Sequence, residues 1–391
     1  MRELKRRKIE DIDTYAPYYI ISYACHCFNL INLKEKIYYE GGGIPNMRLH
    51  LVNIGAPGTG KSYMMKQMGH ADYGIFAGTS KKFQFEGNMS ESGLSGSFFR
   101  TATGETQTIE GAAYENKYGF ILFDEFSALH DAMRQSYNSN LETQLLQALD
   151  SGMINKRLSG GRISYDTNFT LWGGVQPVRT NLSRGLGRRL CVLLHKTNLS
   201  DTEKMIDAQF ESMNVTFNAH ELENMRRSID YWANSFSMIR RIDFDVSIKK
   251  FYKRLGTHHN NIPIYNKILL GYVLAKYGAE KYLTISDDEV EAIKLIEQEE
   301  EWRDDVMSGS DLMQILDLIM QFGQGLGDGT FIIPKAKLMK VGSKIHLTLE
   351  VMDEMIKKLH KMGMFEIKAN VIQYKHTEGD IEKCQSLSAS K

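Results

Sequence analysis

The chain has 391 residues, more than a single ordinary core accommodates, so we expect two to three domains. Its 42% hydrophobic and 25% charged residues are typical of a folded globular protein and argue against extensive disorder. Lys plus Arg (48) equal Asp plus Glu (48), so the net charge does not indicate nucleic acid, and any basic surface must be local.

The cysteines and the apolar runs bear on the cellular compartment. Four cysteines are too few and too scattered for a disulfide framework: Cys25, Cys27, Cys191 and Cys384. The basic start is not followed by the apolar run of a signal peptide, and no stretch reaches the ~18 apolar residues of a membrane span. We therefore expect a cytoplasmic protein with reduced thiols and no membrane partner.

The first half of the chain predicts a helical lead-in, residues 1–48, followed by an α/β core, residues 49–200. In the core, short apolar runs alternate with amphipathic stretches. The runs are LHLVNI (49–54), YGIFAG (73–78), FILF (120–123), FTLWGGV (169–175) and LCVLL (190–194). This alternation is typical of a parallel sheet with helical crossovers.

The second half predicts three further parts. Residues 201–307 are polar and helix-rich, and they predict an all-helical domain that ends in ISDDEVEAIKLIEQEEEWRDD. After a break at Ser308 and Gly309, residues 308–376 predict a winged helix-turn-helix, in which helices precede a β-hairpin. The helices are expected at 311–322, 334–341 and 348–362, and the strands are MFEIK and VIQYK. The polar residues 377–391 predict a disordered tail.

The sequence GAPGTGKS, residues 55–62, has the spacing of a phosphate-binding P-loop and lies between the apolar run LVNI and the helical run YMMKQM. Glycines let backbone N–H groups turn toward phosphates, Lys61 supplies charge to the β- and γ-phosphates, and the Ser62 hydroxyl suits Mg²⁺. ATP is expected to contact a continuous set: Gly55, Ala56, Pro57, Gly58, Thr59, Gly60, Lys61, Ser62 and Tyr63.

A pair of acidic residues completes the predicted site. Asp124 and Glu125 directly follow the apolar run FILF, where a parallel sheet meets its ligand. Asp124 is expected to bind ATP-associated Mg²⁺ together with Ser62, and Glu125 is expected to polarise the attacking water. Together with Lys61, these residues predict an ATPase.

These motifs and their flanks resemble the AAA+ core of the MCM replicative helicases and of relatives that carry a hairpin before the sensor strand. The resemblance is carried by IPNMRLHLVNIGAPGTGKS, ESGLSGSF, ETQTIEGAAYENKYGFILFDEFSAL and ETQLLQALDSGMINKRLSGGRISYDTNFTLWGGVQP, with a lid-like segment at 262–296. It covers about residues 40–300. It implies an AAA+ P-loop parallel-sheet core with an all-helical lid and a C-terminal winged helix.

The resemblance also implies roles for three more residues. Gln176 takes the place of the first sensor, where the family usually has asparagine. The segment RGLGRRL resembles the one that bears the arginine finger, with Arg189 aligned best and Arg188 as its rival. Because such a finger reaches the γ-phosphate of a neighbouring subunit, a homo-oligomer, expected to be a hexamer, is implied.

The chain departs from the family at two points. Tyr265 and Asn266 stand where a second-sensor arginine is expected, and Lys267 is the nearest cation. The large amino-terminal DNA-binding and zinc-bearing region of MCM does not precede this P-loop, which begins at residue 55, so a reduced relative is expected.

Two elements are candidates for DNA contact. The hairpin KRLSGGRISYD carries Lys156, Arg157 and Arg162 around a Ser-Gly-Gly turn, and it could grip phosphates or be an ordinary solvated hairpin. The recognition helix of the winged helix carries three further lysines, Lys357, Lys358 and Lys361, beside acidic residues. That face could bind a protein instead of DNA.

The leading hypothesis is a ring-shaped, ATP-driven DNA translocase or helicase that resembles MCM and acts in replication of a mobile element. Two alternatives stay open. One is a DNA-binding replication initiator or loader that uses ATP as an assembly switch, and the other is a protein-remodelling AAA+ ATPase. DNA-stimulated turnover with strand separation would distinguish the first hypothesis from both alternatives.

Overall fold

The computed structural model describes most of the chain, with gaps. The described residues are 2–7, 11–38, 46–55, 58–87, 89–101, 103, 105–126, 140–158, 161–176, 185–195, 207, 210, 218–326, 330–344, 352, 353, 356, 357, 359, 360 and 365–375. The chain divides into two compact units, Met1–Trp302 and Arg303–Lys391. Among the described helices, none is both long and apolar enough to cross a membrane.

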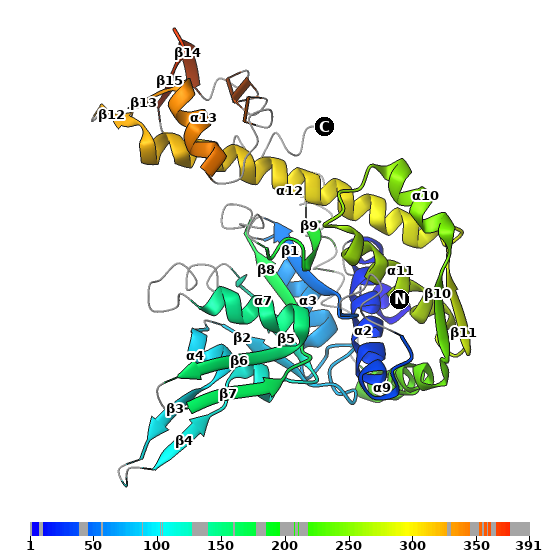
Figure 1. Ribbon diagram of the computed structural model, residues 1–391. Coiled ribbons are helices and arrows are strands. Elements are labelled where there is room, and N and C mark those ends of the chain that lie inside the picture. Colours follow the sequence, from blue (N-terminus) through cyan, green and yellow to red (C-terminus); the bar gives the residue numbers. More distant parts are fainter. Residues whose placement is uncertain are drawn as a thin grey trace. The chain divides into compact units, whose positions relative to one another are not determined.

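The centre of the first unit is a five-stranded parallel sheet, which confirms the α/β class (Figure 1). Its strands are β1 (His50–Gly55), β2 (Phe83–Glu86), β5 (Phe120–Phe123), β8 (Thr170–Val175) and β9 (Leu190–His195). They lie in the order β2-β5-β8-β1-β9, and every neighbouring pair is parallel. Strands β1, β5 and β8 are buried throughout, which is why they read as continuous apolar runs.

One expected strand is wrong. The run YGIFAG forms turns, and the edge strand is FQFE of β2 instead. Gly74 donates its N–H to the His70 carbonyl, and Gly78 has a left-handed backbone with φ 76°. Two such turns cannot lie in an extended strand, although Ile75 and Phe76 are buried as their apolar character predicts.

The amino-terminal helix α2 (Ile12–Glu35), which lies within the predicted helical lead-in, is part of the core of this unit. It packs against α11 (Ile262–Tyr277) and against β1. The Tyr19 hydroxyl donates to Asn53 Oδ1 of β1 at 2.9 Å, and Trp172 Nε1 of β8 donates to Ser22 Oγ at 2.9 Å. Helix α2 therefore packs on the sheet, and the two elements share one buried core.

Two β-hairpins, β3 (Ser97–Arg100) with β4 (Thr106–Ile109) and β6 (Met153–Leu158) with β7 (Gly161–Asp166), extend side by side from the sheet (Figure 1). The Tyr165 hydroxyl donates to the carbonyl of Ser95, beside β3, at 3.2 Å. A Cβ added to Gly161 would lie 3.3 Å from the Phe98 ring. The hairpins are thus in contact near their bases and along one side.

The region expected to be all-helical also contains strands. Its helices are α9 (Ala219–Ser235), α10 (Val246–Leu255) and α11, and between them β10 (Arg241–Phe244) pairs in parallel with β11 (Tyr282–Ile285). Both strands alternate exposed and buried residues, the period-2 pattern that the helical interpretation overlooked. Helix α12 (Val290–Phe322) also continues through the expected break at Ser308 and Gly309, because one helical glycine costs only about 1 kcal/mol.

The second unit has its own sheet and core. Its sheet order is β12-β13-β15-β14, built from β12 (Gln324–Gly325), β13 (Thr330–Pro334), β14 (Phe365–Lys368) and β15 (Val371–Lys375). Helix α13 (Lys335–Lys344) follows β13, a strand that the sequence did not predict. The predicted β14–β15 hairpin is present, with Ala369 and Asn370 left-handed in its turn. Most of the helix expected at 348–362, and the tail at 377–391, lie outside the described residues.

Candidate functional site

The predicted nucleotide residues come together at one edge of the parallel sheet. Strand β8 lies between β1 and β5, and all three run in the same direction. The carboxyl ends of parallel strands share an edge, so the loop after Gly55, Gln176 after β8 and Asp124–Glu125 after β5 are neighbours there. The amide therefore lies between the phosphate-binding loop and the acidic pair.

The loop needs glycine for steric reasons at three positions. Gly58 and Gly60 have φ values of 82° and 79°, in the left-handed region that side chains disfavour. A Cβ on Gly55 would lie 2.6 Å from Thr59 Oγ1 and 2.8 Å from the His195 carbonyl. Gly60 immediately precedes α3 (Lys61–Gly69), so the loop delivers the chain to a helix N-terminus. The predicted contacts Ala56 and Pro57 lie outside the described residues.

Lys61 lies folded over this loop. Its buried ammonium donates to the Gly55 carbonyl at 2.6 Å. Burial lowers the pKa of Lys61, while the charges of Glu125 and Asp124 oppose that shift. A phosphate at the helix N-terminus would compete with the Gly55 carbonyl for this ammonium. In the first turn of α3, Ser62 is partly buried and the Tyr63 side chain is exposed.

Asp124 and Ser62 offer the oxygen ligands that a magnesium ion bound to phosphates requires. Lys66 Nζ lies 3.2 Å from Asp124 Oδ2. Asp124 Oδ1 is buried and has no hydrogen-bond partner among the described residues. Mg²⁺ commonly takes one or two protein oxygens and completes its shell with phosphates and water, so Asp124 and Ser62 fit the predicted role. Gln176 Nε2 donates to Glu125 Oε2 at 3.4 Å, which orients that carboxylate toward β8.

A histidine that the sequence did not single out forms the wall behind the loop. His195 ends β9, its Nε2 lies 3.0 Å from Asn53 Oδ1, and its ring stacks on Tyr15 at 3.9 Å. Burial lowers the pKa of His195 to about 3, and the nearby Lys61 charge acts in the same direction. This neutral side chain, held by its own partners, packs beside Gly55 and Thr59 of the loop. The one signal in the sequence is its position at the end of the apolar run LCVLLH.

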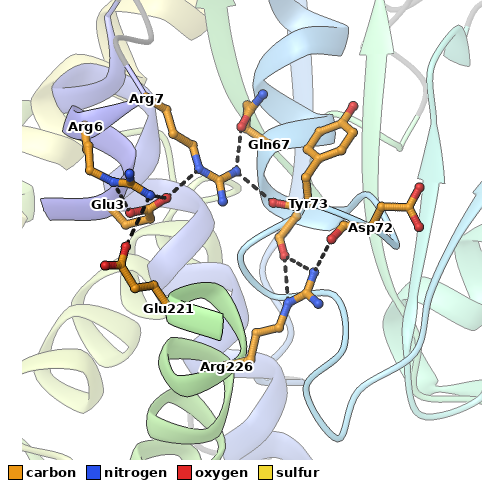
Figure 2. A network of polar contacts seen from close by, with 9 residues as sticks. Glu3, Arg6, Arg7, Gln67, Asp72, Tyr73, Glu221 and Arg226 are labelled. Carbon is orange, nitrogen blue, oxygen red and sulfur yellow. Dashed lines mark hydrogen bonds and ion pairs between the residues drawn. The ribbon is translucent and has the colours of Figure 1, made fainter. Parts of the chain in front are cut away.

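The C-terminal end of α3 is held by two arginines from distant segments (Figure 2). Arg7 Nη1 donates to Gln67 Oε1 and to the Tyr73 carbonyl, both at 2.7 Å, and Glu3 binds its Nε. Arg226 of α9 donates to the Gly74 carbonyl at 2.7 Å. Cations are favourable at a helix C-terminus, so this network fixes the rear of α3. No local pattern in the sequence indicates it.

The two candidate arginine fingers lie far from their own chain's loop. Arg188 and Arg189 precede β9, whereas the loop follows the parallel neighbour β1, so they lie at opposite sheet edges. A six-residue strand separates those edges by roughly 20 Å. Arg189 forms a two-pronged ion pair with Asp150, whose Oδ1 accepts from Nε at 2.6 Å. Arg188 is exposed, so the structure singles out the rival candidate as the accessible cation.

The three cations predicted to flank the turn of the β6–β7 hairpin do not share a face. Lys156 is buried and its Nζ lies 3.7 Å from Glu91 Oε1. Arg157 and Arg162 are exposed and lie directly opposite each other in the register. Successive strand residues point to opposite faces, so Lys156 and Arg157 cannot both face outward. Only the arginine pair is available to a ligand.

Of the remaining predicted cations, the two that the structure describes, Lys357 and Lys267, have partners within the fold. In the second unit, Lys335 and Lys357 both pair with Asp353 at 2.6 Å, and Lys358 and Lys361 lie outside the described residues. In the first unit, Lys267 is buried, and its Nζ lies 3.5 Å from Asn46 Oδ1. Burial lowers the pKa of Lys267 to about 8, with the Arg48 charge as the next cause.

No known family model matches the chain, and no curated protein matches it. The inference about its chemistry therefore rests on the sequence motifs and on the site itself.

Proposed function

We propose that the chain is an ATP-hydrolysing AAA+ ATPase that resembles the MCM helicase core. The observation that carries this proposal is the meeting of three features at the carboxyl ends of adjacent strands β1, β8 and β5. They are the glycine loop with Lys61, the amide of Gln176, and the acidic pair Asp124–Glu125. A phosphate-binding loop beside an oriented carboxylate suits attack of water on a phosphoryl group.

Each side chain then has one task. Lys61 would exchange the Gly55 carbonyl for the β- and γ-phosphates of ATP. Ser62 and Asp124 would hold Mg²⁺, which neutralises phosphate charge when bound. The Glu125 carboxylate would accept a hydrogen bond from the attacking water and so polarise that water. Gln176 would keep the carboxylate in position through the hydrogen bond from its amide.

We further propose that hydrolysis needs a neighbouring subunit, because the candidate fingers lie at the sheet edge opposite their own loop. Arg188 is exposed and suits a contact in trans, while the pairing of Arg189 with Asp150 suits an anchor for the segment. A ring, expected to be a hexamer, would place Arg188 beside the next subunit's γ-phosphate.

Mixing two inactive variants tests this arrangement. Arg188→Ala and Glu125→Gln should each be nearly inactive alone, but a mixture creates interfaces with an intact loop facing an intact Arg188. ATPase activity of the mixture should therefore exceed that of either variant severalfold. Arg227→Ala, which removes another exposed arginine, should behave like the parent. Mixtures no more active than the single variants, despite proven co-assembly, would exclude a finger in trans.

We propose that the oligomer acts on DNA as a translocase or helicase in replication, with the exposed pair Arg157 and Arg162 as the phosphate contact. Replacing both by Ala should keep basal ATPase activity and lower the salt slope of single-strand binding by about 1.4, or 0.7 per lost contact. Both the unwinding of forked DNA and the stimulation of ATPase activity by DNA should decrease in this double variant. Arg227→Ala/Lys294→Ala is the control, since it removes two exposed cations elsewhere.

A second candidate function is an ATP-dependent assembly switch, such as a replication initiator or loader. It is favoured by the burial of Lys156 against Glu91, which leaves the hairpin with fewer outward charges than a strong phosphate grip needs. Failure of the parent protein to unwind forked DNA, together with ATP-dependent assembly on duplex DNA, would favour this candidate over the translocase.

A further inference from the structure

A groove on the helical side of the first unit lies apart from the nucleotide residues. It has a volume of about 730 Å³ and is bounded by β10, α10, the start of α11 and Tyr38. Its walls are mainly apolar, one face of α10 contributes Lys249 and Lys253 to its rim, and Thr257 follows the end of that helix. Pockets of about 300–1,000 Å³ with a few polar groups are typical of ligand sites.

The groove is lined by two lysines and two aspartates, and the two kinds of side chain differ in whether they already have partners. Lys249 and Lys253 are exposed and form no ion pair with any described residue. The two carboxylates of the lining are already engaged. Asp243 pairs with Arg241 at 2.7 Å, and Asp245 caps α10 by accepting from the Ser247 N–H at 2.7 Å. Lys250 and Arg254 directly follow the two lysines on the adjacent stripe of the same helix and are both exposed, so the exposed part of α10 attracts an anion.

Three aromatic side chains line the groove, and one of them, Tyr252, is buried. Tyr38 and Phe244 are half-buried, and their ring centres lie 6.2 Å apart at an angle of 56°. Thr257 Oγ1 is buried beside them in the lining and has no hydrogen-bond partner among the described residues. The groove thus combines ring surfaces, an unsatisfied hydroxyl and free ammonium groups.

We propose that this groove binds single-stranded nucleic acid, with backbone phosphates on Lys249 and Lys253 and a base against Tyr38 and Phe244. Basic side chains that follow the backbone and aromatic rings that stack on bases are the two features such binding needs. A duplex fits poorly, because its bases are stacked inside and cannot enter a pocket without being extruded. This contact goes beyond the proposed ATPase, because it needs neither Lys61 nor Glu125.

Binding of labelled 20-nucleotide poly(dT) and poly(U) to the full chain, without nucleotide, tests the proposal by fluorescence anisotropy. Lys249→Gln/Lys253→Gln should weaken binding at least tenfold and lower the salt slope by about 1.4, which is 0.7 for each lost phosphate contact. Phe244→Leu should weaken binding about five- to a hundredfold through lost stacking. The matched control Lys281→Gln/Lys294→Gln removes the same charge from exposed positions and should bind like the parent.

Ultraviolet crosslinking to poly(dT) should label Tyr38 or Phe244 in the parent protein. Comparison of poly(dT) with poly(U) distinguishes DNA from RNA as the source of the strand. Parent-like affinity of the double lysine variant, crosslinks confined to other segments, or tighter binding of an acidic peptide than of either strand would overturn the proposal. Because Lys61→Ala should leave this binding intact, absence of ATPase activity would contradict the proposed function without affecting the groove.

Discussion

Replacing Glu125 by Gln should abolish ATP turnover, with a loss of about 10²–10⁴-fold, while ATP affinity stays within a few-fold of the parent. The substitution removes the carboxylate that polarises water but keeps the size of the side chain. Lys61, Ser62 and Asp124 remain to bind the phosphates and Mg²⁺. The experiment measures ATP hydrolysis at saturating ATP beside the dissociation constant of a fluorescent ATP analogue.

Two further variants serve as controls for this experiment, one that should lose ATP binding and one that should behave like the parent. Lys61→Ala should lose ATP binding, because it removes the charge that must leave the Gly55 carbonyl for the phosphates. Glu115→Gln makes the same chemical change at an exposed position on the end of α5 (Ala112–Glu115), so it should hydrolyse ATP like the parent. Turnover by Glu125→Gln at the parent rate would show that the acidic pair has been assigned the wrong role.

Mild acid should destabilise the protein by about 4 kcal/mol between pH 7 and pH 5 through two buried histidines, with a further loss from a third. Three histidines of the core are buried and neutral: His26, His50 and His195. Burial lowers the pKa of His26 and of His195 to about 3, and it lowers the pKa of His50 well below its ordinary value. In the unfolded chain each histidine titrates near pH 6.5, so below that pH the unfolded state binds more protons than the folded state.

The sign and size of the effect follow from that difference. The stabilisation is complete above pH 6.5 and is lost progressively as the pH falls toward 3. At pH 5 the loss is about 1.5 pH units, or about 2 kcal/mol, for each of His26 and His195, and His50 acts in the same direction. The whole free energy of unfolding of a domain is about 5–15 kcal/mol, so the loss is a large part of it.

Urea denaturation at pH 7 and pH 5 measures this loss. His195→Gln should lower the stability at pH 7 but reduce the difference between the two pH values by about 2 kcal/mol, because one titrating group is removed. His220→Gln, at an exposed position on α9, should leave the difference unchanged. A free energy of unfolding that is the same at both pH values would show that these histidines are not buried neutral.

The sequence by itself was enough to identify the glycine loop and the acidic pair as a candidate site, because their requirements are local. Gly58 and Gly60 are needed for their left-handed backbone, and that need is visible in the motif without knowledge of any partner. The position of Asp124 and Glu125 at the end of a buried strand was equally visible, since four apolar residues precede them. The parallel sheet followed from the alternation of such runs.

The tertiary structure decided what local patterns leave open. The strand FQFE could not be preferred over YGIFAG from hydrophobicity, because the second run is the more apolar and only its turns exclude it. The hairpin cations could not be assigned to faces either. A strand presents alternate residues to its two sides, and which side is covered depends on Glu91 and its neighbours, far along the chain.

Contacts between distant segments account for the rest. His195 meets Asn53 across 142 residues, and Arg226 meets Gly74 across 152 residues, so neither contact leaves a periodic or spacing signal in the sequence. A local pattern reflects the conformation of a few consecutive residues. The support behind the loop, the clamp on the rear of α3 and the removal of Arg189 from solvent are properties of packing, and only the folded chain brings those side chains together.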